Sequence, residues 1–187
     1  MFIVVSGISG SGKNTVMNRL MAERNNLKVL ERSSGTTRAP RDSDREYNTY
    51  VYLSKEEFEE KIKNGEFYEY EDVHGNYYGT FLNRLEHVVE NQDYDFMRDI
   101  DVKGNISLKK FFKDRCPVLS IFLDVPDKVI RERLKQRGDK AEDIEKRISR
   151  GNLERSYKSH YDLVIENIDL EKTIKTINEY IDKIHKN

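Results

Sequence analysis

The sequence has 187 residues, of which 33 are basic and 34 acidic, so the formal net charge is -1 at pH 7. The length fits one core with small insertions, and the near-neutral charge excludes a strong general attraction to nucleic acid or an anionic membrane. The single cysteine, Cys116, excludes an internal disulfide, and we expect its side chain to be buried. No segment approaches the roughly 18 apolar residues of a membrane-spanning helix, and the start lacks a leader pattern, so we expect a cytoplasmic protein.

The first elements predict an α/β fold that binds a nucleotide. Residues 1–6 form a continuous apolar run, which is typical of a strand buried on both faces of a parallel sheet. A glycine-rich loop follows at 7–13, and apolar residues then recur at helical spacing up to residue 21. Strand, glycine loop and helix in this order predict a three-layer P-loop fold, with a parallel sheet flanked by helices.

A different pattern begins at residue 33, where apolar runs become shorter and aromatic residues denser. Alternation predicts short strands at 50–53 and 66–70. Between them, Ser54 and Glu57 have the spacing of a capping box and predict the start of a helix. We interpret this stretch as a small α+β insert in the main fold.

The α/β alternation returns after the insert and continues to the end of the chain. The expected helices lie at 82–90, 106–113, 129–136 and 170–184, and the expected strands at 94–101, 118–125 and 163–165. The resulting division has core segments at 1–32, 85–127 and 157–187, the insert at 33–84, and a helical lid region at 128–156.

The loop at 7–13 matches the phosphate-binding P-loop through its lysine. Glycines let successive backbone N–H groups turn toward an anion, the helix N-terminus adds partial positive charge, and Lys13 reaches the β- and γ-phosphates. The pattern places Ser or Thr after the lysine to bind magnesium, whereas this chain has Asn14, whose amide oxygen is also a hard ligand. The expected nucleotide contacts are Gly7, Ser9, Gly10, Ser11, Gly12, Lys13, Asn14 and Thr15.

Further segments, in order over essentially the whole chain, resemble signature segments of guanylate kinases. They lie at 33–41, 65–70, 75–80 and 99–104, and the lid region adds Arg133, Arg137 and Arg147. The resemblance implies an enzyme of purine nucleotide metabolism that transfers the γ-phosphoryl group of ATP to GMP or dGMP, with ATP and Mg²⁺ as cofactors. It implies small-molecule partners only, without nucleic acid or membrane, and a monomer or homodimer.

The residues of the acceptor segments suit a phosphorylated guanine nucleotide. Arginines offer planar, multi-donor heads to a phosphate, tyrosines add hydroxyl donors, and similarity assigns four such residues to the GMP phosphate: Arg38, Arg41, Tyr50 and Tyr78. Glu69 can accept from the N1–H and N2–H₂ donors of guanine, and Ser34 can donate to O6. The family places Asp101 near the exocyclic amine, with Gly79 and Thr80 in the same acceptor site.

Phosphoryl transfer needs positioning and positive charge around the transferring group. We expect Lys13, Arg133, Arg137 and Arg147 to supply that charge, and Asp99 to organise magnesium with Asn14, partly through water. Similarity assigns Asn167 to adenine. We expect the insert and the lid to close on binding and exclude water.

Several positions depart from the family pattern. Asp139 stands where Thr is usual, Lys103 where Gln is usual, and Asp44 and Tyr47 alter the stretch after Arg41. Arg98 replaces an aliphatic residue, and either a phosphate contact or an ion pair with an acid would account for it.

Two other functions are compatible with the resemblance. A non-catalytic guanylate-kinase-like module would use the acceptor cleft for phosphorylated peptides, but it does not need a complete phosphate loop. A kinase for a different phosphorylated acceptor would not need the three guanine-reading residues, which are Ser34, Glu69 and Asp101.

Overall fold

The computed structural model describes residues 1–40, 47–73 and 75–186. The chain divides into two compact units, of which the first comprises Met1–Lys28 and Tyr94–Asn187 and the second Val29–Asp93. Each unit is a separate body in the description that follows. Within the described residues, no helix is both long enough and apolar enough to cross a membrane.

The first unit is built on a five-stranded sheet with the order β2-β7-β1-β8-β9. Its strands are β1 (Phe2–Ser6), β2 (Leu27–Val29), β7 (Asp95–Asp99), β8 (Val118–Asp124) and β9 (Leu163–Glu166). Its helices are α1 (Lys13–Glu23), α4 (Val102–Phe112), α5 (Asp127–Gln136), α6 (Ala141–Arg155), a short 3-10 helix (Lys158–His160) and α7 (Leu170–His185). The four strands from β7 to β9 pair in parallel.

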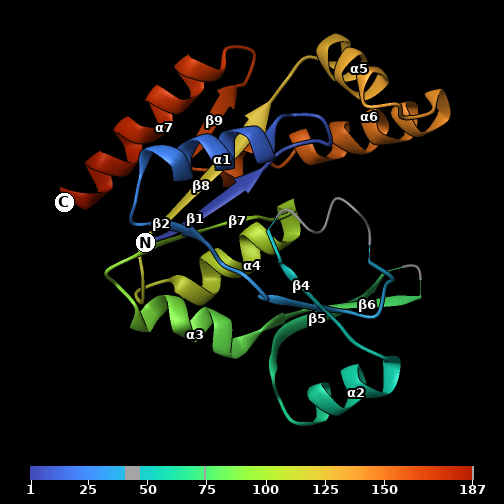
Figure 1. Cartoon of the computed structure of the whole chain (residues 1–187), viewed down its shortest axis with the longest axis vertical. Coiled ribbons are helices and arrows are strands. Elements are labelled where there is room, and N and C mark those ends of the chain that lie inside the picture. The colour runs from blue at the N-terminus through green and yellow to red at the C-terminus, as the bar shows by residue number, and fades with distance from the viewer. Residues whose placement is uncertain (41–46, 74, 187) are drawn as a thin grey trace. The chain divides into compact units, whose positions relative to one another are not determined.

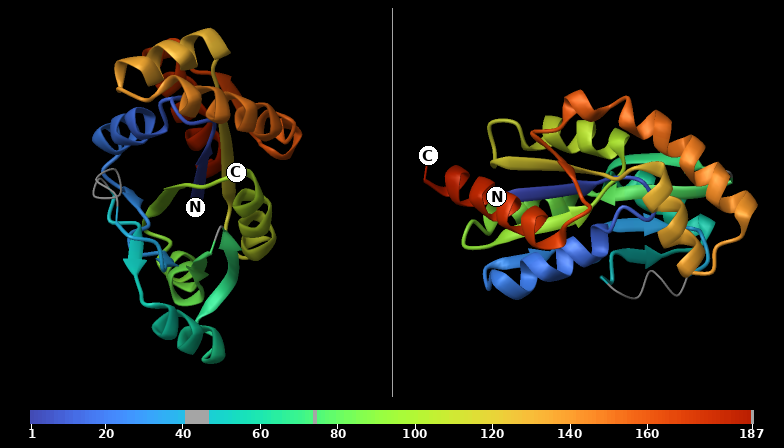
Figure 2. Two further views of the ribbon diagram at one scale, coloured as in Figure 1. Left: turned by 90° about the vertical axis from the view of Figure 1, so that its right-hand side faces the viewer. Right: turned by 90° about the horizontal axis from the view of Figure 1, so that it is seen from above.

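Helices cover both faces of this sheet, which confirms the predicted parallel sheet flanked by helices. Figure 1 shows the arrangement, and both views of Figure 2 place α1 and α4 on opposite sides of β1 and β8. β1 lies in the middle, and all five of its residues are buried. The apolar run without alternation therefore reflects a strand that contacts apolar neighbours on both faces.

Two predicted boundaries in the first unit are wrong. The strand expected to continue to residue 101 ends at Asp99, and the helix expected near residue 106 begins at Val102. The reason is Asp101, whose carboxylate accepts a hydrogen bond from the Gly104 backbone N–H at 2.9 Å and caps α4. The expectation of a buried Cys116 is also wrong, because this thiol is half-exposed, beside the Pro117 carbonyl in the turn before β8.

The second unit is a mixed α+β body with the sheet order β4-β3-β6-β5. Its elements are β3 (Ser34–Thr36), β4 (Tyr50–Tyr52), α2 (Lys55–Lys63), β5 (Phe67–Val73), β6 (Asn76–Phe81) and α3 (Leu82–Glu90). β3 pairs in parallel with β4 and antiparallel with β6, which in turn pairs antiparallel with β5. The predicted capping box is confirmed: the Glu57 N–H donates to Ser54 Oγ at 3.1 Å, and the Ser54 N–H donates to Glu57 Oε2 at 2.7 Å.

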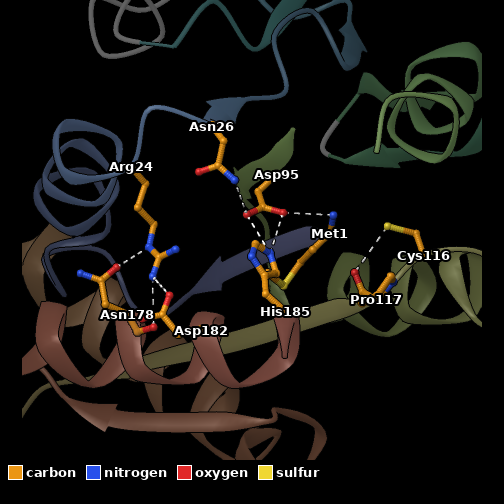
Figure 3. A network of polar contacts seen from close by, with 9 residues as sticks. All are labelled: Met1, Arg24, Asn26, Asp95, Cys116, Pro117, Asn178, Asp182 and His185. Atoms are coloured by element: carbon orange, nitrogen blue, oxygen red, sulfur yellow. Dashed lines mark hydrogen bonds and ion pairs between the residues drawn. The ribbon is translucent and has the colours of Figure 1, made fainter. Parts of the chain in front are cut away.

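A polar network attaches α7 to the rest of the first unit (Figure 3). His185 Nε2 lies 3.1 Å from Asp95 Oδ2, and Asn26 donates to the same carboxylate at 3.3 Å. Nearer the middle of α7, Arg24 donates to Asn178 Oδ1 at 2.6 Å and pairs with Asp182. These contacts supplement the apolar face of α7 and hold the last helix against α1 and β7.

A second polar cluster links the end of β8 to the last residue of α6 and to the 3-10 helix that follows. Arg155 Nε donates to Asp124 Oδ1 at 3.0 Å, and Lys158 binds Oδ2. Arg155 also pairs with Asp127 at 2.7 Å. Burial acts to raise the pKa of Asp124, but the hydrogen bonds from Lys158 and Arg155 outweigh it and hold the pKa below its usual value of 3.8.

We expect the Asp124→Asn variant to lose about 2 kcal/mol of unfolding free energy at pH 7, because two cations lose their anionic partner. A carboxylate whose pKa is lowered by folding stabilises the protein above its unfolded pKa, and this contribution is lost as the pH falls through the folded value. The difference between parent and variant should therefore be constant above about pH 5 and shrink below the usual value of 3.8. Urea unfolding at several pH values measures it. Asp93→Asn is the control, since Asp93 is an exposed loop residue, and an equal loss in both variants would contradict the assignment.

Candidate active site

The glycine loop between β1 and α1 adopts a conformation that requires glycine. Gly10 and Gly12 have φ values of 87° and 90°, in the left-handed region. Gly12 also caps the N-terminus of α1, and a Cβ there would lie 2.8 Å from Asn167 Nδ2. Asn167 in turn donates from Nδ2 to the Ser11 carbonyl at 2.7 Å. The loop is thus shaped by its own backbone and held by the predicted adenine-side residue.

Lys13 stands at the first position of α1 with its side chain folded over the loop. Its Nζ donates to the carbonyls of Gly7 at 2.6 Å and Ile8 at 3.3 Å. Removal from water lowers the pKa of Lys13 below its usual value, while the nearby carboxylates of Asp99 and Glu154 act in the opposite direction. The ammonium group is therefore a poorly hydrated cation, which strengthens its attraction for an anion brought to the loop.

The predicted lid arginines lie at the same loop. Arg133 donates to the Gly10 carbonyl at 3.3 Å and to the Asn167 carbonyl at 3.1 Å. Arg147 Nη1 donates to Ser9 Oγ at 2.9 Å. Arg137 is close enough to Lys13 for its charge to lower the pKa of the lysine. Lys13, Arg133 and Arg147 thus contact the glycine loop directly, whereas Arg137 binds Asp139.

Close packing places α5 and α6 beside the loop (Figure 1). Ile8 of the loop belongs to a buried apolar cluster whose other members are Val125, Ile130, Leu134, Ile144 and Ile148. Gly151 of α6 faces Ile8 so closely that a Cβ at residue 151 would lie 2.3 Å from Ile8 Cγ2. The α6 backbone can approach the loop only because this position has no side chain.

We expect Gly151→Ala to destabilise the protein by about 1–2 kcal/mol. Overpacking costs about 1–3 kcal/mol, and the higher helix propensity of alanine returns at most about 1 kcal/mol. Urea unfolding measures the loss, and Ser149→Ala is the matched control, since Ser149 is exposed on the same helix. The cost of Gly151→Ala should shrink in an Ile8→Ala background, and equal costs in both backgrounds would show that Ile8 is not the obstacle.

The donor groups for a magnesium ion fit the predicted site. Asn14 is exposed in the first turn of α1, and Asp99 is half-buried at the carboxyl end of β7. Both offer hard oxygen ligands. Over the described residues, no group of three or more His, Cys, Asp or Glu side chains could hold a metal. Mg²⁺ is commonly bound through one or two protein groups together with nucleotide phosphates, so two oxygen donors are enough for such a site.

In the second unit, four predicted acceptor residues form one row across the sheet. The strand register places Ser34 of β3 beside both Tyr50 of β4 and Thr80 of β6, and it places Thr80 beside Glu69 of β5. Residues paired across strands project from the same face. Thr80 Oγ1 donates to Glu69 Oε1 at 3.3 Å. Ser34 and Thr80 are buried, and Glu69 is half-buried, so the row ends in a partly sheltered carboxylate beside the Thr80 hydroxyl group.

The predicted phosphate-binding residues continue this face. Tyr78 lies two residues from Thr80 on β6 and therefore projects from the same side. The Arg38 guanidinium lies over the Tyr50 ring at 5.2 Å from its centre, and Arg38 Nη1 donates to the Ala39 carbonyl at 2.7 Å. Arg41, like Asp44, falls outside the described residues.

The opposite face of the same sheet is apolar and explains Gly79. A Cβ at Gly79 would lie 2.7 Å from Phe67 Cδ1 and 3.0 Å from Phe58 Cζ. Phe58 of α2 stacks on Phe67 with ring centres 4.4 Å apart. Gly79 thus lets α2 pack against the sheet, and it faces away from the row that contains Thr80.

The residues described next lie in the first unit, each in a different environment. Asp101 belongs to the first unit, where its carboxylate caps α4. Arg98 is buried on β7 opposite Val4 of β1. One residue that the sequence did not identify as functional lies among the lid arginines: Asp139 binds Arg137 and Arg147. Its sequence signal was the replacement of a usual Thr directly after Arg137 and Gly138.

Comparisons with known proteins show which family the whole chain resembles. A family model described as guanylate kinase matches residues 1–184. The guanylate kinase of Bacteroides thetaiotaomicron is 38% identical over 188 residues, which cover 97% of this chain and 90% of that protein. The guanylate kinase of Porphyromonas gingivalis is 37% identical over 182 residues, covering 96% and 95%.

Two solved structures are similar to this chain, one in sequence and fold and one in fold alone. The crystal structure of guanylate kinase from Anaplasma phagocytophilum matches with a TM-score of 0.69 and 29% identity, covering 98% of this chain and 84% of that one. A shikimate kinase from Aquifex aeolicus, at 18% identity and a TM-score of 0.51, shares the fold alone. Since the family model spans nearly the whole length and the relatives are similar over almost all of it, this chain belongs to the guanylate kinase family.

Proposed function

We propose that this chain is an ATP:GMP phosphotransferase, which moves the γ-phosphoryl group of ATP to GMP or dGMP and releases ADP and GDP or dGDP. Family membership over almost the entire chain supports the proposal. The observation that carries it is the convergence of Lys13, Arg133 and Arg147 on a complete phosphate loop. A protein that only displayed an acceptor face to a peptide would have no use for that convergence.

On the donor side, the chain supplies positive charge and fixed N–H groups. The γ-phosphoryl group passes through a transition state with charge spread over its oxygens, and catalysis comes mainly from positioning and electrostatic stabilisation. Lys13 is held over the loop by two carbonyls, and the Arg147 head reaches Ser9 on the loop. We assign these groups, together with Arg133 and Arg137, to the charge that develops on the transferring group.

On the acceptor side, the row in the second unit suits guanine. Glu69 can accept from the two adjacent guanine donors, and Thr80, which already donates to Glu69 at 3.3 Å, holds the carboxylate in place. Ser34 can donate to O6. Adenine has no such pair of donors, so the half-buried carboxylate would gain no partner on the base, a mismatch that can reject the wrong base by about 10⁴-fold. We assign Tyr50, Tyr78, Arg38 and Arg41 to the GMP phosphate.

We assign Asn14 and Asp99 to a magnesium ion that arrives with the nucleotide. When bound, Mg²⁺ neutralises charge on the β- and γ-phosphate oxygens. The GMP phosphate oxygen is already an anionic nucleophile, so no side chain needs to remove a proton from it. The residues of this chain therefore bind, orient and exclude water, and we expect the lid arginines to complete the cationic surroundings when the nucleotides are bound.

We also expect ATP to be the preferred donor, with Asn167 near adenine, and we expect the enzyme to work in the cytoplasm as a monomer or homodimer. Asn14 in place of the usual hydroxyl residue is the one feature that favours a weakly active or purely binding member of the family. Turnover decides between these functions, because a binding module retains nucleotide affinity without producing ADP.

A coupled assay of ADP release with GMP, dGMP, AMP, CMP and UMP as acceptors tests the proposal. We expect fast ADP release with GMP and dGMP and at least about 10³-fold lower kcat/KM with the other three. Equal rates with GMP and AMP would contradict the proposal that the row recognises guanine. ADP release that is the same with and without any acceptor would identify an ATPase instead.

A further inference from the structure

Asp139 occupies a rigid turn between α5 and α6. The Gly138 N–H donates to the Lys135 carbonyl at 3.0 Å, and the Asp139 N–H donates to the Leu134 carbonyl at 3.1 Å. With Gly138 at a φ of 89°, these two bonds form a Schellman motif that ends α5. The backbone of Asp139 is therefore fixed without any help from its side chain, which leaves the carboxylate available for another task.

The carboxylate holds two arginines of the lid region. Arg137 donates from Nε to Oδ1 at 3.0 Å and from Nη2 to Oδ2, and Arg147 Nε lies 3.3 Å from the same Oδ2. The Asp139 side chain is 16% exposed, whereas those of Arg137 and Arg147 are 51% and 45% exposed. A partly buried anion thus bridges two half-exposed cations, one from the end of α5 and one from α6.

Asp139 contacts both arginines in a way that leaves some of their terminal nitrogens available for other partners. Asp139 engages both heads through Nε, the nitrogen nearest the side-chain stem. Terminal nitrogens therefore remain for other partners, and Arg147 uses Nη1 to reach Ser9 of the phosphate loop at 2.9 Å. An arginine side chain loses rotamer entropy when it is immobilised. A side chain that is already held before the nucleotide binds avoids that cost at the moment of reaction.

The charge state of Asp139 is consistent with this arrangement. Hydrogen bonds from Arg137, with added attraction from the Arg147 charge, hold the pKa of Asp139 below its usual range. The group is therefore an anion at neutral pH and keeps both arginines paired.

We propose that Asp139 is a positioning residue for phosphoryl transfer, which acts through Arg147 by holding its head toward the phosphate loop, while Arg137 binds the same carboxylate. The inference rests on the proposed function of the site and goes beyond it, because the usual Thr at this position cannot bridge two guanidinium groups. A different role, as a counter-charge that weakens triphosphate binding, predicts the opposite result: removing the charge would then tighten ATP binding and leave turnover unchanged.

The test compares steady-state kinetics of the parent protein with those of Asp139→Asn, which keeps the shape and removes the charge. We expect kcat to fall by about 10-fold to 10²-fold, as for a misplaced catalytic group, with the KM for GMP changed by less than about twofold. Asp139→Glu should recover part of the loss. Glu145→Gln is the matched control, because Glu145 pairs with Arg131 across the same two helices, away from the loop; it should retain the parent kcat.

A double-mutant cycle isolates the route through Arg147. If Asp139 acts through that arginine, Asp139→Asn should cost less than about threefold in an Arg147→Ala background. A full, unchanged cost in that background would overturn the inference, as would an Asp139→Asn enzyme with the parent kcat or with a lower KM for ATP alone. Thermal unfolding checks each variant, and Asp139→Ser replaces Asp139→Asn in the cycle if the latter does not fold. An unmodified protein that transfers nothing to GMP would refute the proposed function itself, whereas an active parent matched by Asp139→Asn would refute only this inference.

Discussion

The Lys13→Ala variant is expected to lose about 10²-fold to 10³-fold in kcat and to keep its fold. The loss follows because the ammonium group is a poorly hydrated cation at the phosphate loop, and removal of a single preorganised electrostatic contact costs about 10²–10³-fold in comparable sites. The fold should survive because burial already penalises the charged lysine, as its lowered pKa indicates. Steady-state turnover with saturating ATP and GMP, together with thermal unfolding, measures both parts.

Lys175→Ala is the control for this experiment. Lys175 is an exposed residue of α7 in the same unit, so its removal eliminates one positive charge without changing the loop. It should leave kcat within about twofold of the parent, since isolated surface charges contribute little. Turnover of Lys13→Ala within tenfold of the parent would mean that the loop does not hold the transferring phosphate.

The Glu69→Gln substitution should remove most of the preference for guanine. The new amide would present one acceptor and one donor to the two donors of guanine. One hydrogen bond would therefore be lost, and two donor groups would face each other in its place. We expect kcat/KM for GMP to fall by about 10³-fold or more while the KM for ATP stays within about twofold. The GMP-to-AMP ratio of kcat/KM values is the quantity to measure, because a general loss of stability lowers both values together.

Glu71→Gln provides the comparison for Glu69. Glu71 is exposed two residues further along β5, and its substitution makes the same chemical change on the same strand. The GMP-to-AMP ratio of this control should equal that of the parent. If both variants lowered the ratio equally, the effect would come from the charge of the strand and not from a contact with the base.

Local sequence signals predicted much of the fold correctly, and the exceptions have physical reasons. The capping box at Ser54 was readable because side chain and backbone partners lie within one turn. β3 was missed as a strand because Ser34–Thr36 consists of three small residues without apolar alternation, and its formation depends on pairing with β4 and β6. The early start of α4 was missed because the acids after β7 were interpreted only as site residues, whereas Asp101 also caps the helix.

Some parts of the candidate site could likewise be predicted from the sequence, and others could not. The glycine loop and Lys13 follow from a short contiguous pattern, and the row of Tyr50, Ser34, Thr80 and Glu69 was anticipated through the family resemblance. Their alignment in one register depends on three strand pairings that no local signal specifies. The bridge from Asp139 to Arg147 could not be predicted either, because it depends on the packing of α5 and α6 in one apolar cluster, which no local signal specifies.

Transfer of label from γ-labelled ATP to GMP tests the central claim most directly. With the parent protein, Mg²⁺ and both nucleotides, the label should appear in GDP in step with the loss of ATP, and the label should stay on ATP when GMP is omitted. Label that appears only as inorganic phosphate, or ATP that stays intact while both nucleotides bind, would contradict a phosphotransferase that uses GMP as its acceptor.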